Sequence, residues 1–306
     1  WEREFARIVG DFGNYNLEVF LGNPPNPRLV FKKNEVKIKS SEFLGNMQLV
    51  FFHPEDLNML YLGPDLRRRY LDLMNMQVKR SYLLAFKNYK KILTQRNALL
   101  KAIKEQRAGR DDLKLWDEQL VRAAVYLYKE RASTIQFLNR QITDKYRKLS
   151  QGNEYVVLNY VNSLQLPAEQ MVEENLESIM SNLLQANLNR DLSAEYTTIG
   201  PHRDDFEVIM NDRPINIHAS RGEYRTIILA LKLLEIDFFK SFEFSEPILL
   251  LDDVFSELDE HRQALLLEYV REYQTFITTT QNSEVLSALK GLGANQINVV
   301  GGKVVS

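Results

Sequence analysis

The 306-residue sequence contains no cysteine, which excludes disulfide bonds and thiolate metal sites and fits a reducing cytoplasm. No apolar run approaches 18 residues, so we expect no transmembrane helix and no membrane partner. The first residues, Trp1–Phe5, carry charges where a signal peptide needs an apolar stretch, and they do not begin with methionine. We therefore expect a cytoplasmic protein that has lost an N-terminal segment by truncation or processing.

Residues 1–65 have the pattern of a β-rich unit. Leu17–Leu21 alternates apolar and charged residues, as a half-buried strand does, and Val36 and Ile38 lie between lysines on a further short strand. Asn23–Pro27 predicts a turn. Leu49–Phe52 is a continuous apolar run, which is typical of a strand buried on both faces.

Residues 66–190 predict an α-helical arm. No Pro or Gly interrupts the chain between Pro64 and Gly109, and none occurs from Arg110 to Gln151. Apolar residues recur at helical spacing in both stretches, and the break near Gly109 supplies a helix stop followed by an acidic start. The sequence therefore predicts a long antiparallel helix hairpin, with another helix after Pro167 that runs through Met171 to Leu183.

Residues 191–306 alternate between strand and helix patterns. Two short strands, Phe206–Met210 and Ile215–Ile217, are expected to form a hairpin. After them we expect a helix from Gly222 to Lys240, a buried strand at Ile248–Leu251, a helix from His261 to Tyr273, a strand at Phe276–Thr280 and two short strands in the valine-rich tail. This alternation predicts an α/β unit with a parallel sheet.

Two carboxylates, Asp252 and Asp253, directly follow the predicted buried strand. Ligands bind at the carboxyl edge of an open parallel sheet. There one carboxylate can hold a Mg²⁺ ion on nucleotide phosphates, and the next can orient or deprotonate an attacking water. An acidic loop after a core strand is the alternative interpretation.

Ser220 and Gly222 stand at the start of the helix predicted from Gly222. A hydroxyl and free backbone N–H groups at a helix N-terminus can face an anion. Ser220 with Glu223 three residues later also fits an ordinary capping box, and both interpretations can hold together.

The order of these parts resembles that of ABC-type ATPase heads. The matching stretches are Ser220–Glu223 for the signature motif, Leu250–Asp253 for Walker B, Ser256–Asp259 for the D-loop and Thr278–Thr280 for the switch position. Among such heads the chain resembles the RecF family of bacterial recombination and repair ATPases. Three further stretches carry that resemblance, and with the motifs they span almost the whole chain: Phe52–Leu57 with Gly63-Pro64 and Arg67–Asp72, Gln95–Lys101, and Gly200–Asp205.

The resemblance implies an α/β fold of the P-loop NTPase class with an inserted α-helical arm, called lobe II. It implies ATP and Mg²⁺ as cofactors, with Asp252 as the metal carboxylate and Asp253 as the catalytic carboxylate. It also implies that nucleotide contacts come from the remaining motif residues: Ser220, Arg221, Gly222, Glu223, Asp259 and Thr280. Thr280 stands where transporter-type heads carry a histidine, which argues against a transporter.

No G-x-x-x-x-G-K-[ST] motif occurs in the 306 residues. In heads of this type that phosphate-cradling loop precedes every motif named above, which agrees with the start of the chain at a residue other than methionine. The sequence therefore predicts that this chain alone binds ATP poorly and does not hydrolyse it.

Positive charge is concentrated between Arg67 and Arg110, where 13 Lys and Arg face only two acids, Asp72 and Glu105. Such a stretch can neutralise DNA phosphates without reading sequence. The candidate contacts are Arg67, Arg68, Arg69, Lys87, Lys90, Lys91 and Arg96. A solvated helix face, or a site for an acidic partner, is the alternative interpretation.

Taken together, the resemblance implies a DNA-dependent ATPase of slow turnover that dimerises on ATP and binds double-stranded DNA near single-strand gaps. It also implies the mediator proteins RecR and RecO as partners. The alternative is a non-enzymatic scaffold that binds DNA or protein through the basic helix. A nuclease with an added metal-binding domain is disfavoured because too little chain follows Thr280.

Overall fold

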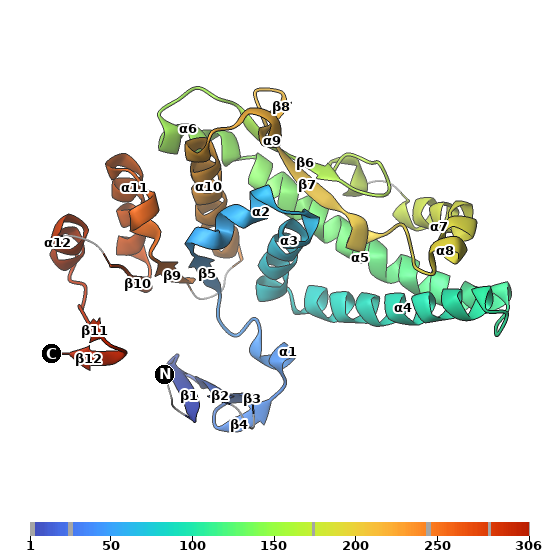
Figure 1. Ribbon diagram of the computed structural model, residues 1–306, viewed down its shortest axis with the longest axis horizontal. Coiled ribbons are helices and arrows are strands. Elements are labelled where there is room, and N and C mark those ends of the chain that lie inside the picture. The colour runs from blue at the N-terminus through green and yellow to red at the C-terminus, as the bar shows by residue number, and fades with distance from the viewer. Residues whose placement is uncertain (1–3, 24–26, 173–174, 243–245, 281–282, 306) are drawn as a thin grey trace.

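The computed structural model describes residues 4–23, 27–172, 175–242, 246–280 and 283–305. Figure 1 shows three regions: a small sheet near the N-terminus, a central body around β5, β9 and α10, and a long helical arm formed by α4 and α5. Buried residues of the central body and of the arm belong to one continuous hydrophobic core. The expected boundaries at residues 65 and 190 therefore do not interrupt the core.

The N-terminal sheet is antiparallel, with its four strands in sequence order. The strands are β1 (Phe5–Asp11), β2 (Asn16–Gly22), β3 (Arg28–Lys33) and β4 (Val36–Ile38). The strands expected at Leu17–Leu21 and around Val36 are confirmed. Of the turn expected at Asn23–Pro27, residues 24–26 lie outside the described residues.

The central sheet is parallel and has the order β10-β9-β5. Its strands are β5 (Leu49–Phe52), β9 (Ile248–Asp252) and β10 (Thr275–Thr278), which confirms the expected parallel arrangement. Helix α10 (Arg221–Lys240) packs against it, and its Lys232 Nζ donates to the backbone oxygen of Phe51 at 2.6 Å. Val50, Leu249 and Leu251 are nearly inaccessible to solvent.

The opposite face of the central sheet is partly open. Phe51, Leu250 and Phe276 lie side by side in register across the three strands. Phe51 is 41% exposed and Phe276 is 56% exposed. The expectation that Leu49–Phe52 is buried on both faces is therefore wrong, because α10 covers the face that carries Val50 and leaves Phe51 on the other.

The arm confirms the expected antiparallel hairpin, since α4 (Arg80–Lys104) and α5 (Leu113–Asn139) run side by side. Each predicted helical stretch is divided into two helices. Lys79 adopts an extended backbone between α3 (Pro64–Val78) and α4, and Gln141 separates α5 from α6 (Ile142–Ser150). Neither break has a Pro or Gly, so the residue pattern gave no signal for it.

A third sheet joins the arm region to the C-terminal region. It consists of β6 (Val156–Val161), β7 (Asp205–Met210) and β8 (Arg213–Pro214), and β6 has no counterpart among the predicted strands. Asn211 and Asp212 form the predicted turn with positive φ angles of 49° and 62°. The strand expected at Ile215–Ile217 is wrong, because the chain turns into α9 (Ile215–His218) directly after Pro214.

The remaining predicted helices and strands are found within a few residues of their expected positions. The helix expected after Pro167 begins later, at Leu176, and residues 173–174 lie outside the described residues. The other elements are α1 (Ser40–Phe43), η1 (Pro54–Leu57), α2 (Asn58–Tyr61), η2 (Arg110–Asp112), η3 (Gln170–Val172), α7 (Leu176–Ala186), α8 (Leu188–Ala194), η4 (Pro201–Arg203), η5 (Val254–Glu257), α11 (Glu260–Glu272), α12 (Ser283–Gly291), β11 (Asn298–Val300) and β12 (Lys303–Val305).

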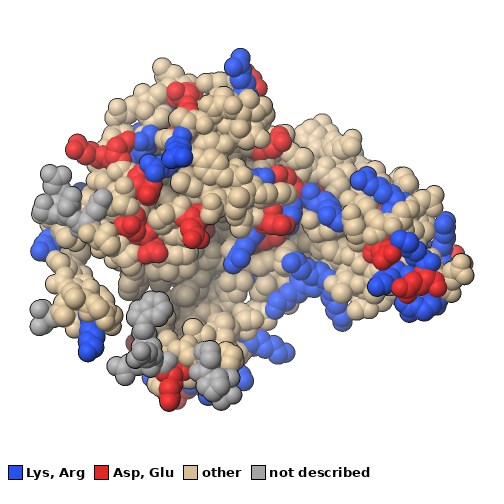
Figure 2. Space-filling view, in the orientation of Figure 1, with Lys and Arg blue, Asp and Glu red and all other residues tan. Residues whose placement is uncertain are grey.

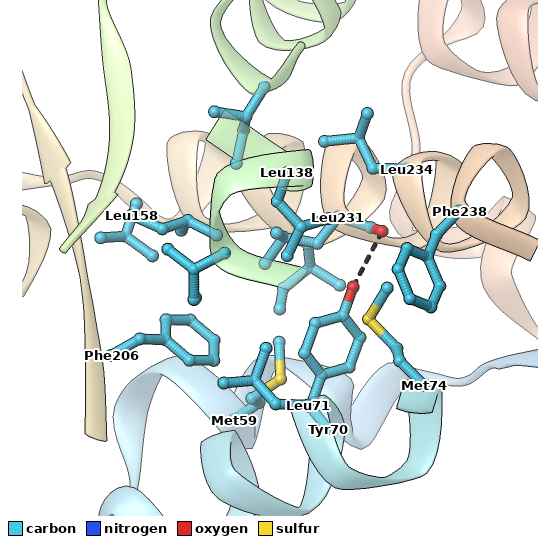
Figure 3. Packing of buried hydrophobic residues seen from close by; sticks show 14 of the residues in the cluster. Met59, Tyr70, Leu71, Met74, Leu138, Leu158, Phe206, Leu231, Leu234 and Phe238 are labelled. Carbon is cyan, nitrogen blue, oxygen red and sulfur yellow. Dashed lines mark hydrogen bonds between the residues drawn. The ribbon is translucent and has the colours of Figure 1, made fainter. Parts of the chain in front are cut away.

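The core between α3 and α10 fixes the arm to the central body. Tyr70 of α3 is buried, and its hydroxyl donates to the backbone oxygen of Leu231 in α10 at 3.0 Å (Figure 3). Met74 and Phe238 lie beside this bond. A buried tyrosine needs such a partner, because an unpaired hydroxyl in an apolar core costs roughly 1–3 kcal/mol.

Arg96 is completely buried, so the prediction that it contacts DNA is wrong. Its guanidinium donates to Asp117 at 2.6 Å, Asp191 at 2.7 Å and Thr197 at 2.8 Å. Asp191 is also fully buried. These bonds join α4, α5, α8 and the segment before β7, and they leave this cation no access to a DNA phosphate.

We expect Arg96→Ala to lower the free energy of unfolding by about 3–5 kcal/mol, because it leaves the Asp191 carboxylate buried without its cation. Urea denaturation followed by circular dichroism measures this change. Lys91→Ala, an exposed position on the same helix, is the control and should change the value by less than about 0.5 kcal/mol. Equal effects of the two substitutions would contradict the structural role of Arg96.

Candidate functional site

Asp252 and Asp253 lie at the carboxyl edge of the central sheet. Asp252 ends β9 and is exposed. Asp253 has a left-handed backbone with a φ of 49°, which is uncommon for a residue other than glycine and turns the chain sharply away from the strand. The Oδ1 atom of Asp253 is buried and has no hydrogen-bond partner among the described residues. A buried carboxylate oxygen without a partner is costly, so this position calls for a reason beyond the packing of the chain.

Thr278, the last residue of β10, holds both aspartates in place. Its hydroxyl donates to Oδ1 of Asp252, and its backbone oxygen accepts the Asp253 N–H at 3.0 Å. The parallel register pairs Thr278 directly with Asp252. Thr280, the residue named from the sequence, is exposed and lies beyond the end of β10. Sequence reasoning missed Thr278 because three consecutive threonines give no signal of which one faces Asp252.

The predicted signature segment forms the exposed start of α10. Ser220 is the N-cap: its Oγ accepts the Glu223 N–H at 3.3 Å, and the Glu223 carboxylate accepts the Ser220 N–H at 2.5 Å. This confirms the capping box. Ser220, Arg221 and Gly222 are all exposed. The first turn of a long helix, with its positive dipole end, is therefore open to an anion.

The predicted D-loop segment lies against the first turns of α10. Arg225 of α10 pairs with Glu257 of η5. Asp259 caps α11, because it accepts the Arg262 N–H at 2.9 Å, and it also pairs with the Arg262 guanidinium. Asp259 thus has a structural role in this chain, and its carboxylate remains more than half exposed.

Four exposed cations stand on α3 and on α4 of the arm. Arg69, Lys87, Lys90 and Lys91 are exposed, and no ion pair engages them within the described part of the chain. Figure 2 shows Lys and Arg side chains gathered along the part of the arm where Figure 1 places α4. We call Arg69, Lys87, Lys90 and Lys91 the basic row.

Arg67 and Arg68 are engaged in internal bonds instead. Arg67 forms a bidentate pair with Asp205, at 2.6 and 2.8 Å, and also donates to two backbone oxygens near α2. Arg68 donates to the backbone oxygen of Asp204 and pairs with Asp65. The Arg67–Asp72 and Gly200–Asp205 stretches therefore bind each other, and we assign both arginines to structure rather than to DNA.

A buried charged cluster lies beneath the end of β5. Lys232 of α10 is 3.4 Å from Asp56 of η1 and 3.7 Å from Glu235. Burial raises the pKa of Glu235 to about 7, with the opposite effect of Lys232 too weak to compensate. Glu235 also lines a cavity of about 580 Å³ beside β5. Its Oε2 has no hydrogen-bond partner among the described residues.

The fold and the site together define the class of the protein: an ABC-type ATPase head with an inserted helical arm. Curated relatives named "DNA replication and repair protein RecF" match almost the whole chain. The protein of Ruminiclostridium cellulolyticum is 34% identical over 97% of this chain and 80% of its own length. That of Thermoanaerobacter sp. (strain X514) is 38% identical over 89% of this chain and 74% of its own length. The chain belongs to the RecF family.

Solved structures agree with this assignment. The structure of the recombination mediator protein RecF with ATPrS in the RecFOR pathway has a TM-score of 0.84 and 32% identity, and the alignment covers 99% of this chain and 81% of that one. The RecF–ATP structure of the same pathway has a TM-score of 0.81 and 32% identity, over 93% of this chain and 76% of that one. No protein-family model matches the chain.

Within the described part of the chain, no helix combines the length and the apolar content that crossing a bilayer requires.

We expect Glu235→Gln to change how stability depends on pH. The unfolded chain releases the Glu235 proton near pH 4.5 and the folded chain near pH 7. Rising pH through that window therefore favours unfolding of the wild type, since the unfolded state binds fewer protons there. The variant lacks this titration, so its free energy of unfolding relative to wild type should increase by about 2–3 kcal/mol between pH 5 and pH 8. Urea denaturation at both pH values measures the change, and a constant difference would contradict the assignment.

Proposed function

We propose that this chain supplies the DNA-binding arm and part of the nucleotide site of an ATP-dependent clamp in recombinational DNA repair. The observation that carries the proposal is the pairing of Asp252 and Asp253 at the sheet edge, held by Thr278. A protein that only binds DNA has no need for a carboxylate whose buried oxygen has no partner. Family membership supports the repair role.

The residues at this edge fit a Mg²⁺–ATP complex. Asp252 offers exposed carboxylate oxygens, the ligands that Mg²⁺ prefers. Asp253 is the next carboxylate at the same edge, and we assign it the role of orienting a water or accepting its proton. Bound Mg²⁺ supplies electrostatic stabilisation of the phosphate oxygens. RecF proteins have been solved with ATP and with ATPrS, which supports ATP as the ligand.

The exposed start of α10 is proposed to contact the γ-phosphate of ATP held by a second copy of the protein. Ser220, Arg221 and Gly222 present a hydroxyl, a guanidinium and free backbone N–H groups to solvent. Asp259 and the segment around Glu257 lie beside this surface through the Arg225 pair and complete the proposed dimer face. ATP would thus act as the link between two heads, and its slow hydrolysis would release them.

The 306-residue chain contains no Walker A motif. We propose that it does not hydrolyse ATP by itself and that turnover needs a phosphate-binding loop outside this sequence. RecR and RecO are the proposed protein partners, because the solved RecF structures are described as part of the RecFOR pathway. A non-enzymatic scaffold is the second candidate, and it is favoured by the exposed cations of the basic row, which make no ion pair within the described residues.

The nucleotide contact can be tested by substitutions at Ser220 in a form of the protein that carries a phosphate-binding loop. Aspartate is as good an N-cap as serine, but its charge repels a γ-phosphate. We expect ATP and Mg²⁺ to dimerise the wild type in sedimentation velocity, and Ser220→Asp to remain monomeric with unchanged stability. Ser220→Thr keeps the hydroxyl and should dimerise, whereas Asp253→Asn should dimerise and separate slowly.

If the wild type stays monomeric with ATP, the clamp is refuted and the scaffold remains. If Ser220→Asp dimerises like the wild type, the contact through α10 is refuted, while the carboxylate site at Asp252 stands.

DNA binding by the basic row can be tested by its salt dependence. Each lysine that contacts a phosphate contributes roughly 0.9 to the slope of log K against log salt concentration. We expect Lys87→Ala with Lys91→Ala to reduce that slope by up to about 2 for a 30-base-pair duplex, measured by fluorescence anisotropy of the 306-residue chain. Lys303→Ala, an exposed control on β12, should leave the slope unchanged. An unchanged slope in the double variant would show that Lys87 and Lys91 of the basic row do not contact DNA phosphates.

A further inference from the structure

A cavity of about 450 Å³ opens beside the basic row, between α3, α4, α5 and η4. We call it the arm cavity. Its volume lies within the roughly 300–1,000 Å³ typical of small-ligand pockets. Binding of DNA phosphates to a flat surface does not require a cavity. We therefore ask which ligand the arm cavity could bind.

Several polar groups that line the arm cavity are buried and bind one another, and we call them its floor. Arg131 donates to Asp72 at 2.9 and 3.1 Å and to the backbone oxygen of Pro201 at 2.6 Å. His202 Nδ1 is 2.6 Å from the Tyr89 hydroxyl, and Nε2 is 3.0 Å from the backbone oxygen of Thr197. Burial lowers the pKa of His202 to about 4, so this ring is neutral at pH 7. Within the described part of the chain, these floor groups are therefore occupied by one another and are not free to recognise the hydrogen-bonding groups of a base.

The walls are apolar and the rim is cationic. Leu73, Phe86, Leu93 and Leu127 line the sides. Two cations of the basic row, Arg69 and Lys90, also line the cavity, and Lys90 Nζ lies 5.0 Å from the centre of the Phe86 ring. The two acids at the cavity are neutralised, since Asp72 pairs with Arg131 and Asp65 with Arg68. The arm cavity is therefore lined mainly by apolar side chains and has two cations, Arg69 and Lys90, at its opening.

We propose that the arm cavity receives one unpaired nucleotide of DNA, with its base against the apolar wall and its phosphate at Arg69 and Lys90. This proposal rests on the proposed DNA binding and names the DNA structure that the arm prefers. Single-stranded nucleic acid is bound by this combination of apolar or aromatic surface for the base and cations for the backbone. Because every base has an apolar face and the floor is already bonded, the site should accept any base.

The cavity also predicts selectivity between DNA forms. A base within a duplex is stacked on both faces and paired at its edge, so it reaches a pocket only after the cost of extrusion has been met. A nucleotide that is already unpaired avoids that cost. The arm should therefore bind a duplex that ends in an unpaired nucleotide more tightly than a fully paired duplex, through the same row of cations.

An acidic peptide with an apolar side chain would match the same slot and rim. The basic row favours DNA, because Lys87 and Lys91 add two exposed cations on α4 that do not line the cavity. A single peptide anchor would not need that extension, whereas a DNA backbone presents phosphates at regular intervals.

The test compares two probes on the 306-residue chain: a 20-base-pair blunt duplex, and the same duplex with one unpaired 2-aminopurine nucleotide at an end. We expect the overhang to bind about 5-fold more tightly or better, since stacking of one base is worth roughly 1–3 kcal/mol. The fluorescence of 2-aminopurine should change on binding. Leu73→Trp fills the cavity and should abolish both the advantage and the fluorescence change, while affinity for the blunt duplex is retained.

Leu84→Trp is the matched control, because Leu84 is exposed on α4 and does not line the cavity. It should behave as the wild type. Arg69→Gln provides a second route if Leu73→Trp fails to fold, since Arg69 is exposed and makes no ion pair within the described residues. It too should remove most of the advantage of the overhang.

Equal affinity of the wild type for both probes, with normal salt dependence, would overturn the nucleotide site and leave the proposed DNA binding intact. No binding of either probe would overturn both. If a peptide of six glutamates ending in phenylalanine binds the wild type but not Leu73→Trp, and the overhang advantage survives in that variant, the arm cavity is a peptide site and the proposal fails.

Discussion

The buried guanidinium of Arg131 is the interaction on which the arrangement of this molecule depends. Arg131 lies on α5. Its guanidinium donates hydrogen bonds to Asp72 of α3, to Asp204 in the segment before β7 and to the backbone oxygen of Pro201. Burial raises the pKa of Asp204 to about 6 even though Arg131 acts in the opposite direction. Such a cluster adds little net stability, but each partner is costly to remove once the others are buried. It therefore fixes α3, α5 and the segment before β7 in one geometry, and residues of these elements line the arm cavity together with α4.

Helix α10 connects the remaining surfaces to this frame. Its exposed first turn is the proposed nucleotide contact, and Arg225 one turn later pairs with Glu257, which follows Asp252 and Asp253 in the chain. Further along, Lys232 bonds to the end of β5, and the Leu231 backbone accepts the hydroxyl of Tyr70 from α3. One helix thus connects the proposed nucleotide contact with the central sheet and with α3, the helix that leads into the arm. If α10 moved relative to α3, the Tyr70 hydroxyl would lose its buried partner. If α10 moved relative to β5, Lys232 would lose the backbone oxygen of Phe51.

The sequence predicted most of the regular elements, since long periodic helices and short buried strands leave clear patterns. It also located the carboxylates at the end of β9 and the cap at Ser220. It failed where distant partners decide the role of a residue. A count of charges cannot separate exposed Lys91 from Arg96, whose partner Asp191 lies 95 positions away. Thr278 is distinguished from its neighbours only by its register opposite Asp252. The alternation at Ile215–Ile217 resembled a strand, but the tertiary structure places one helical turn there.

The open face of the central sheet has a consequence for the behaviour of the chain in solution. Phe51, Leu250 and Phe276 form an apolar row in register, and β10 is an edge strand within the described sheet. Parallel sheets are normally covered on both faces, and an uncovered apolar face next to an unpaired edge promotes association between molecules. This attraction requires neither nucleotide nor DNA and weakens little with salt. The chain should therefore show a concentration-dependent, salt-insensitive self-attraction, which differs in origin from the ATP-linked dimer proposed above.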